Sequence, residues 1–517
     1  MQYEHRLDPG EAASKGGKLG SLWPAQVTAN QPLLVEVLSK KDQWVLNLLI
    51  GAWLLSVACF TAWWFRPGHV ENPWLFAFNS FVLGWGIIMP GYYFYFLRRM
   101  KKPNPALPIP VDWRIAMVVT RAPSEPFAMA QKTLLAMKVQ DVPHDTWLAD
   151  EDPSPEILAW CREHDIKVST RRGVAAYHRS EWPRRAKCKE GNLAYFYDHY
   201  GYDNYDFVSQ LDTDHVPTPG YLRQMLLPFW DPKVGYVSAP SICDLNAKKS
   251  WTARGRLSLE CHIHGSLQAG YHSGWVPMCI GSHYAVRSKA LKEIGGVGPE
   301  LAEDHSTTFL MNAGGWIGLH SIDAEAHGEG PASFMDGMVQ EFQWARSLVM
   351  IFLGAYVLPP LAVFLQRSFA HVSYLEFALY SIWPTLTSIL AVLFLKRRKL
   401  LRPVDAKVIC WEGICFQLAR WPWVAWAVID AFRASIDRRH LSWKVTPKAG
   451  NGASAIPIQF LVPYFFIIAG SALVAFCSAP TLATRGYYYF TLINVVTYIF
   501  LLVWIPYLNR RETRTTS

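Results

Sequence analysis

Six long apolar stretches constrain the fold of this chain more than any other feature of its sequence. They run over Trp44–Phe65, Trp74–Leu97, Leu348–Leu365, Tyr374–Leu395, Ile456–Phe476 and Tyr487–Leu508. Each comes near the roughly 20 apolar residues that an α-helix needs to cross a bilayer. The hydrophobic share of the whole chain, 51%, is also high for a single soluble domain. The sequence therefore predicts a multi-pass membrane protein with pairs of transmembrane helices in 41–98, 346–398 and 456–509.

Basic clusters follow the second, fourth and sixth apolar stretches. Their members are Arg98, Arg99, Lys101, Lys102, Lys396, Arg397, Arg398, Lys399, Arg510, Arg511 and Arg514. Because basic loops stay on the cytoplasmic side of a membrane, all three clusters are expected there. This orientation places the tails 1–40 and 510–517 and the polar insert 105–345 in the cytoplasm. The expected location is the inner (cytoplasmic) membrane.

A seventh apolar stretch, Val408–Phe432, differs from the other six. It contains Glu412, Arg420 and Asp430, and basic residues flank it on both sides. A further crossing would leave one basic flank outside, so we interpret the stretch as one or two amphipathic helices at the cytoplasmic interface. A membrane crossing is the alternative. With the polar residues after it, the stretch forms a segment over 399–455.

The polar insert alternates short strand patterns with helical patterns. The predicted strands are Ile115–Thr120, Thr146–Ala149, Ile166–Thr170 and a run that ends at Asp212, and the predicted helices include Pro126–Lys138 and Glu156–His164. Such alternation is typical of an α/β domain with a mainly parallel sheet. In open sheets of this type, ligands bind outside the carboxyl ends of the strands. Asp150, Asp152, Asp212 and Asp214 follow such ends, so we expect them at one edge.

Basic residues precede the last of these strands. They are Arg184, Arg185, Lys187 and Lys189. Acids gathered beside cations fit a metal-chelated diphosphate, because the metal bridges carboxylate to phosphate and the cations offset the remaining charge. Asp212 and Asp214 alone would equally fit a turn, since aspartate is common where strands end. The chain lacks both G-x-x-x-x-G-K-[ST] and G-x-G-x-x-G, which argues against phosphate-loop hydrolysis and dinucleotide redox chemistry, and no nucleic-acid partner is expected.

Five motifs occur in a specific order within the insert. They are Lys189-Glu-Gly191-Asn192-Leu193, Asp212-Thr-Asp214-His215, Cys279-Ile-Gly281-Ser282, Ala302-Glu303-Asp304 and Gln340-Glu-Phe-Gln343-Trp344. The set resembles processive family-2 membrane glycosyltransferases: bacterial cellulose synthase, and with it curdlan, chitin and hyaluronan synthases. A sixth element, Trp443-Lys-Val445-Thr446-Pro-Lys448, resembles the gating loop of cellulose synthase. The resemblance implies an α/β GT-A-type nucleotide-sugar-binding domain inserted between transmembrane α-helices.

The resemblance also implies a role for each motif. Asp304, with Glu303 beside it, would be the catalytic base, and Asp214 would hold Mg²⁺ or Mn²⁺. The residues expected to bind the donor are Asp150, Asp152, Lys189, Asp212, Asp214, Thr446 and Lys448, with Asp212 nearer the nucleotide ribose. The acceptor-binding residues would be Trp344, Gln340, Gly281 and Ser282.

One departure from the family pattern concerns the leaving group. Gln343 stands where the motif has an arginine, so a cation that would help neutralise the diphosphate is missing. Arg346 lies three residues further on, near the same face of a helix, and is a candidate replacement. Gln343 and Arg346 are therefore the residues expected near the leaving group.

The expected function is metal-dependent, inverting transfer of a sugar from a nucleotide sugar, with UDP-glucose the expected donor, to a growing β-linked polysaccharide. Translocation of the product across the membrane would be coupled to synthesis, and periplasmic or envelope export subunits are candidate partners. One alternative keeps the chemistry but adds a single sugar to a membrane lipid. Another is a transporter whose nucleotide-binding domain is catalytically inactive.

Overall fold

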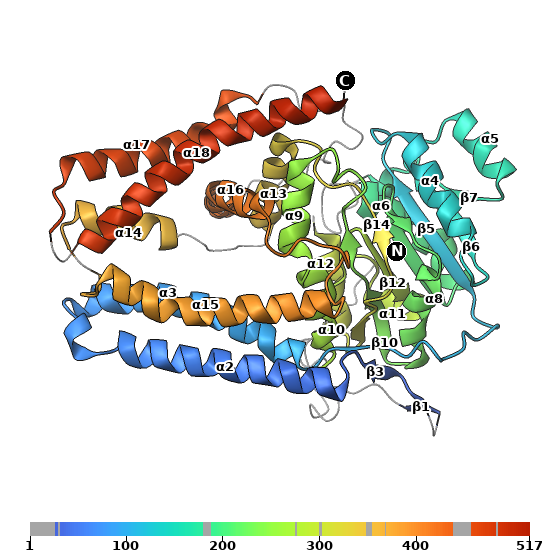
Figure 1. Cartoon of the computed structure of the whole chain (residues 1–517). Coiled ribbons are helices and arrows are strands. Elements are labelled where there is room, and N and C mark those ends of the chain that lie inside the picture. Colours follow the sequence, from blue (N-terminus) through green and yellow to red (C-terminus); the bar gives the residue numbers. More distant parts are fainter. Residues whose placement is uncertain are drawn as a thin grey trace. The chain divides into compact units, whose positions relative to one another are not determined.

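The structure is a computed structural model that describes residues 26–28, 31–178, 188–273, 277–298, 302–347, 354–367, 369–437, 456–481 and 484–516. The chain forms two compact units (Figure 1). The sheet unit contains the chain up to Leu38 together with Arg99–Ile242 and His262–Gly328. The helical unit contains Ser39–Arg98, Cys243–Cys261 and Glu329–Ser517. Each is described by itself.

A seven-stranded sheet organises the sheet unit. In spatial order its strands are β13 (Ile317–His320), β10 (Val234–Ser238), β12 (His283–Arg287), β8 (Phe207–Asp212), β5 (Ile115–Arg121), β6 (Asp145–Asp150) and β7 (Lys167–Ser169). The strands β8, β5, β6 and β7 are parallel, and β12 runs antiparallel to both of its neighbours. Helix α4 (Phe127–Lys138) connects β5 to β6, and helix α5 (Pro155–Glu163) connects β6 to β7. The predicted mainly parallel α/β sheet is confirmed.

Both faces of this sheet are buried, and the alternation of side chains along β5 shows why. Ile115, Met117 and Val119 belong to the apolar cluster on one face. Ala116 and Val118 belong to the cluster on the other face. Successive side chains of a strand point to opposite faces, so a strand covered on both sides is apolar throughout. The sheet is therefore a rigid base for the loops at its edges.

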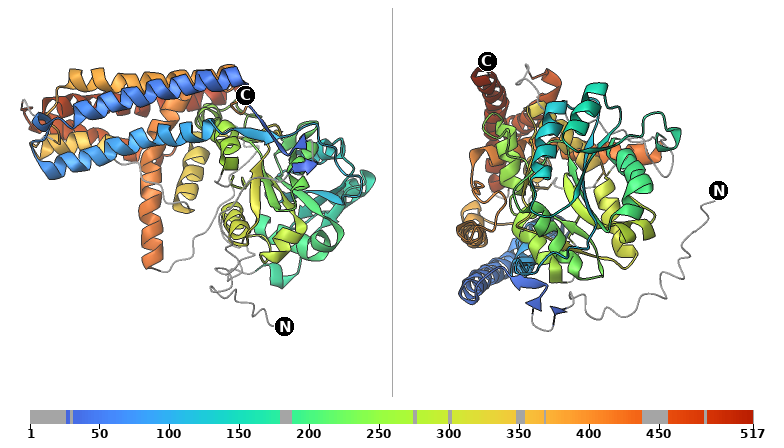
Figure 2. Two further views of the ribbon diagram at one scale, coloured as in Figure 1. Left: turned by 90° about the horizontal axis from the view of Figure 1, so that it is seen from below. Right: turned by 90° about the vertical axis from the view of Figure 1, so that its right-hand side faces the viewer.

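Four helices of the helical unit are long and apolar enough to cross a membrane: α2 (Lys40–Trp64), α3 (Pro73–Leu97), α15 (Tyr374–Arg397) and the part of α18 over Arg485–Glu512. Helix α2 packs along α15, and α17 (Val462–Cys477) packs along α18 (Figure 2). Four of the six predicted spans thus form helices that are long and apolar enough to cross a membrane. Helix α17 has 16 residues. The predicted span Leu348–Leu365 contains helix α14 (Gly354–Phe364), and its residues 348–353 lie outside the described residues.

The seventh apolar stretch forms one continuous helix, α16 (Trp411–Ile436). Its charged residues have partners within the unit: Glu412 Oε1 lies 3.0 Å from Arg254 Nε, and Arg420 Nη1 lies 3.0 Å from Glu341 Oε2. These ion pairs account for polar residues within an otherwise apolar helix. The predicted helix is confirmed, and its position at a membrane interface stays a prediction.

Two helices from within the predicted domain 105–345 belong by their contacts to the helical unit. They are α9 (Trp251–Glu260) and α13 (Phe334–Ser347), and both pack on α16. Glycines allow α9 to approach α16 closely. A Cβ on Gly255 would lie 2.8 Å from Glu412 O and 2.8 Å from the Cβ of Phe416. The sheet unit therefore lacks two helices of the predicted domain 105–345, because α9 and α13 belong to the helical unit.

Replacing Gly255 by alanine should destabilise the helical unit. Helix propensity alone would favour alanine by about 1 kcal/mol, but the added methyl meets backbone, and overpacking costs about 1–3 kcal/mol. We expect the midpoint of thermal unfolding in detergent to fall by several degrees. Gly470→Ala in α17 is the matched control, because a Cβ there has nothing within 4 Å. Equal midpoints for the two variants would contradict the close packing of α9 and α16.

Candidate active site

Lys189 lies at the centre of a group of acids in the sheet unit. It comes from α6 (Cys188–Phe196), and its Nζ donates to Asp212 Oδ1 at 2.7 Å, where β8 ends. The same Nζ lies 3.4 Å from Glu303 Oε1, at the start of α12 (Glu303–Ala313). One cation thus joins the predicted donor-binding acids to the predicted catalytic helix.

The charges in this group shift one another's ionisation. Burial alone would lower the pKa of Lys189, but the negative charges of Asp212 and Glu303 raise it above its ordinary value. The pKa of Glu303 is raised to about 8: burial is the main cause, the charges of Asp304 and Asp212 add to it, and Lys189 opposes it. Lys189 is therefore a fixed positive charge in this site, whereas Glu303 carries a proton more readily than an exposed glutamate does.

The loop between Asp212 and Asp214 is held from three sides through Thr213. The Thr213 hydroxyl lies 2.5 Å from Thr120 O and 2.8 Å from Glu125 Oε2. Its carbonyl accepts from the Thr133 hydroxyl at 2.7 Å. Glu125 is itself buried. These hydrogen bonds fix the two aspartates that flank Thr213 at the carboxyl edge of the sheet.

Asp212, Asp214 and His215 could hold a metal ion. One ligand atom from each residue lies within 4.8 Å of the others, and Asp214 is 1% exposed. His215 Nδ1 lies 3.2 Å from Asp214 Oδ1. Two carboxylates with one imidazole are a donor set that suits Mn²⁺, and carboxylates suit Mg²⁺. The residues present therefore fit the predicted metal, and His215 is a candidate ligand that the sequence reasoning did not single out.

The two acids after β6 differ in environment. Asp150 is fully buried: its Oδ2 accepts from Arg121 Nη1 at 2.7 Å, and its Oδ1 accepts from the Asp152 amide at 3.0 Å. The Asp152 side chain is 55% exposed and pairs with Arg172 at 3.0 Å. Asp150 thus supports the end of the strand, and Asp152 is the more accessible of the two carboxylates.

Asn192 explains why one motif needs an amide. Its Nδ2 donates to Arg121 O at 3.3 Å and to Ala149 O at 3.2 Å, the carbonyls near the ends of β5 and β6. Its Oδ1 accepts from Arg171 Nε at 2.9 Å. A single buried side chain therefore joins α6, which carries Lys189, to the carboxyl edge of the sheet.

The Cys279–Ser282 loop and the start of α12 are tied together around Asp304. The Thr308 hydroxyl accepts from the Cys279 amide at 2.9 Å and donates to Asp304 O at 2.9 Å. Asp304 Oδ1 accepts from the His305 amide at 2.8 Å. A Cβ on Gly281 would lie 2.9 Å from Asp304 Oδ2. The loop thus needs glycine at this position because the carboxylate approaches the backbone.

Replacing Gly281 by alanine should lower turnover without unfolding the protein. The methyl would contact Asp304 Oδ2 and force the carboxylate to turn away, which costs little energy in a flexible side chain but misplaces the predicted base. We expect at least about a tenfold loss of turnover, equivalent to about 1.4 kcal/mol in the barrier. Gly470→Ala, the same change at a position where a Cβ meets nothing within 4 Å, is the control. Equal turnover in the two variants would contradict this placement of Asp304.

The remaining predicted site residues lie elsewhere or outside the described part. Gln340, Gln343 and Trp344 are on α13 in the helical unit, where Gln343 is buried and the other two are half-buried. Arg346 is in the same helix, but its side chain is outside the described residues, as are Thr446 and Lys448 entirely. The structure therefore brings together the donor side of the predicted site within one unit and the acceptor-side tryptophan and glutamine within the other.

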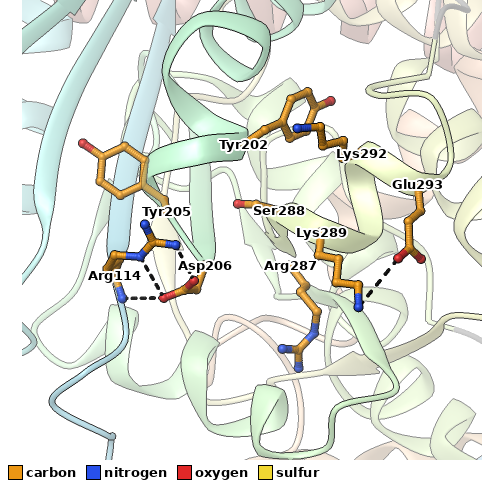
Figure 3. A pocket seen from close by; sticks show the side chains of 9 residues that line it. All are labelled: Arg114, Tyr202, Tyr205, Asp206, Arg287, Ser288, Lys289, Lys292 and Glu293. Atoms are coloured by element: carbon orange, nitrogen blue, oxygen red, sulfur yellow. Dashed lines mark hydrogen bonds and ion pairs between the residues drawn. The ribbon is translucent and has the colours of Figure 1, made fainter.

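A cavity of about 550 Å³ lies at the opposite edge of the same sheet (Figure 3). Arg114 and Asp206, which precede β5 and β8, line it and form an ion pair at 2.9 Å. Lys289 and Glu293 line it from α11 (Ser288–Glu293) and pair at 3.9 Å (Figure 3). Arg287 and Lys292 also line the cavity, so its lining carries four cations and two anions. The cavity is separate from the candidate active site.

Comparisons with known proteins identify relatives of this chain. A cellulose synthase catalytic subunit [UDP-forming] from Xanthomonas axonopodis pv. citri is 26% identical over 329 residues, which is 59% of this chain and 42% of the relative. Cellulose synthase 1 from Komagataeibacter xylinus is 24% identical over 262 residues, 49% of this chain and 16% of the relative. The chain thus spans less than half the length of these curated relatives. A mannosyltransferase structure from Pyrobaculum calidifontis, solved with GDP-Man and Mn²⁺, is 15% identical, covers 71% of this chain and 99% of its own, and has a TM-score of 0.39.

A family model provides the assignment. The model described as "Glycosyl transferase family group 2" matches residues 207–507, more than half of the chain. The match begins at β8, runs through the D-T-D-H motif, α12 and α13, and continues into the apolar helices. An α/β sheet unit flanked in sequence by helices long and apolar enough to cross a membrane agrees with the architecture that the resemblance implied. The chain belongs to glycosyl transferase family group 2.

Proposed function

We propose that this chain transfers glucose from UDP-glucose, with inversion and with a divalent cation, to a growing β-linked polysaccharide. The observation that carries the proposal is the position of Lys189, which contacts Asp212 on the donor side and Glu303 on the catalytic helix. A nucleoside diphosphate bears negative charge that increases as its bond to the sugar breaks. A half-buried cation beside the donor acids and next to Asp304 suits that change of charge.

Asp304 is the proposed general base. Its carboxylate accepts the proton of the acceptor hydroxyl while that oxygen forms a bond to the anomeric carbon of the donor. The bond from this carbon to the diphosphate oxygen breaks, and its electron pair leaves with UDP. Displacement from the opposite side inverts the configuration, so an α-linked donor yields a β-linked product. Glu303, which binds a proton readily, keeps the charge beside Asp304 low.

Asp214, with Asp212 and His215, is the proposed metal site. The bound Mg²⁺ or Mn²⁺ would neutralise charge on the diphosphate oxygens. Asp212, which ends β8 beside the proposed metal site, is the proposed contact of the ribose. Asp152, the accessible acid after β6, is the better candidate than Asp150 for contact with the uracil.

The acceptor side of the proposal rests on α13. Trp344 offers an aromatic face for stacking of a sugar, and Gln340 lies one helical turn earlier. Gly281 and Ser282 would border the acceptor near the base. Gln343 and Arg346, together with the segment that holds Thr446 and Lys448, are proposed to act near the leaving diphosphate. Of these, only the side chains of Gly281, Ser282, Gln340, Gln343 and Trp344 lie among the described residues.

The membrane helices are proposed to take up the product. With the basic clusters on the cytoplasmic side, the sheet unit meets cytoplasmic UDP-glucose at the inner membrane. Synthesis at that face would then feed a chain into the helical unit for translocation, and export subunits of the envelope would receive it.

The test uses purified full-length protein in detergent with a panel of nucleotide sugars and either Mg²⁺ or Mn²⁺. We expect UDP release from UDP-glucose with formation of a high-mass product, and linkage analysis of that product identifies the bond. Absence of nucleotide release from every donor with both metals would overturn the proposal. A single glycolipid product instead of a polymer would overturn the polymerase part and favour single addition to a lipid.

A further inference from the structure

Arg256 is a buried cation that has no part in the proposed sugar transfer. It lies on α9 in the helical unit, and its residue surface is 7% exposed. Its Nε donates to both carboxylate oxygens of Glu260 one turn later, at 2.9 and 3.0 Å. Burial alone would lower the pKa of Arg256, but the charge of Glu260 raises it above its ordinary value, so the guanidinium is charged. The Glu260 side chain is 19% exposed, so this ion pair is shielded from solvent mainly on the side of Arg256.

The same guanidinium contacts both acceptor-side residues of α13. Its Cζ lies 4.4 Å from the centroid of the Trp344 ring, within the range of a cation–π interaction. Its Nη1 donates to Gln340 Oε1 at 2.9 Å. Trp344 and Gln340 are thus held by one planar group that offers several donors in fixed directions.

This contact determines what each of the two residues can offer to a ligand. Arg256 covers one face of the Trp344 indole, so a stacked sugar has only the opposite face to use. The guanidinium has no acceptor, so Gln340 must present its carbonyl oxygen to Arg256. Its amide nitrogen, a donor, is then the group turned away from Arg256, and it suits the oxygen of a sugar hydroxyl. A change at Arg256 would therefore free both the ring and the amide to turn.

Helix α13 is also held from α16, which limits how far the whole helix can respond. Glu341, adjacent to Gln340, pairs with Arg420 of α16 at 3.0 Å. Phe342 and Ala345 pack with Val424 and Ala427. With the backbone of α13 held in this way, the orientation of the two side chains depends on their own contacts.

We propose that Arg256 is a positioning residue for the acceptor: it orients the Trp344 ring and the Gln340 amide so that an acceptor sugar stacks with its hydroxyl directed for transfer. The inference rests on the proposed function, because it requires that α13 binds an acceptor. The donor side does not depend on it. Without Arg256, UDP release should continue while incorporation of the sugar into product falls. The reason is that water can attack the donor in place of a badly oriented acceptor hydroxyl.

The experiment measures glucose incorporated into product per UDP released, in purified full-length protein with UDP-glucose and Mn²⁺. The main variant is Arg256→Met with Glu260→Gln, which removes both charges and leaves no carboxylate unpaired. We expect the incorporation ratio to fall at least about tenfold, or about 1.4 kcal/mol, with the KM for UDP-glucose and the rate of UDP release within about twofold of wild type. Trp344→Ala should cause a similar fall, and combining the changes should add little.

Two lysine variants test the geometry rather than the charge. Arg256→Lys keeps the charge but loses the planar group that reaches Glu260, Gln340 and Trp344 together, so its ratio should also fall. Arg254→Lys on the same helix is the matched control: Arg254 pairs with Glu412 at 3.0 Å and Glu512 at 2.9 Å, and its ratio should equal that of wild type.

A wild-type ratio in both Arg256 variants would overturn the inference. So would a parallel loss of UDP release and incorporation, since that pattern belongs to donor binding or folding. If wild-type protein itself releases UDP but forms no glycosylated product, acceptor binding on α13 is wrong and the inference falls with it. If the wild-type protein releases no nucleotide from any donor, the proposed function has failed at the donor step. This failure is distinguishable from failure of the inference about Arg256, because UDP binding and UDP release are measured independently of the incorporation ratio.

Discussion

Replacing Asp304 by asparagine is expected to abolish sugar transfer while UDP binding is kept. The amide has the size of the carboxylate and retains an oxygen for the His305 amide, which now lies 2.8 Å from Asp304 Oδ1. It cannot accept the proton of the acceptor hydroxyl. Loss of a positioned base typically costs about 10²–10⁴-fold in rate. Turnover is measured as UDP released with UDP-glucose and Mn²⁺, and binding as the Kd for UDP by calorimetry.

The control for Asp304→Asn is the same chemical change at Asp203, which lies outside the candidate site and has an 83% exposed side chain paired with Lys292 at 3.2 Å. Asp203→Asn should retain wild-type turnover and Kd. Both variants should unfold at temperatures close to that of wild type. Turnover of Asp304→Asn above a tenth of the wild-type value would remove Asp304 from the role of base.

The sheet was predictable from the sequence because its strands are short, β-branched and bounded by helices. The run Ile115–Thr120 became β5 (Ile115–Arg121), and the run ending at Asp212 became β8. The carboxyl ends of parallel strands share an edge, so the positions of Asp150 and Asp212 followed from topology. The contact between Lys189 and Asp212, by contrast, depends on how α6 packs on the sheet, which Asn192 fixes through carbonyls of two strands.

The helical unit was less predictable, since its assignment depends on packing between distant segments. Sequence order placed α9 and α13 in the polar domain, but a close contact at Gly255 joins α9 to α16. The role of Arg256 could not be inferred before that packing was known, because nothing in the local sequence around it indicates Trp344 as a neighbour. Hydropathy predicted six membrane spans. The lengths of the helices separate four long candidates from α17, which has 16 residues.

Replacing Lys189 by methionine should have the second-largest effect, on both stability and donor binding. The variant leaves Asp212 without the amine that now lies 2.7 Å away and Glu303 without its nearest cation. Removing one partner of a buried ion pair costs about 3–5 kcal/mol, and the partial exposure of these side chains reduces this to about 3 kcal/mol. Loss of the cation should also weaken binding of UDP at least about tenfold. Chemical unfolding and calorimetry, both with a chelator present, measure the two effects.

The dependence on pH tests whether Glu303 is part of this effect. In the wild type, burial raises the pKa of Glu303 to about 8, and without Lys189 it should rise further. An acid whose folded-state pKa is raised destabilises the fold as pH rises from its ordinary value toward the raised one. Near pH 5 Glu303 is protonated in both folded proteins, so the variant loses only the pairing with Asp212.

Above pH 8 the wild type ionises Glu303 beside Lys189, whereas the variant has no cation to offset that charge. The loss of stability in Lys189→Met should therefore be larger at pH 9 than at pH 5. Glu303→Gln is the matched background, because glutamine keeps the shape and cannot ionise. In that background the effect of Lys189→Met should be nearly the same at both pH values. If Lys189→Met still costs more stability at pH 9 than at pH 5 in the Glu303→Gln background, by the same amount as before, then a group other than Glu303 responds to the loss of Lys189.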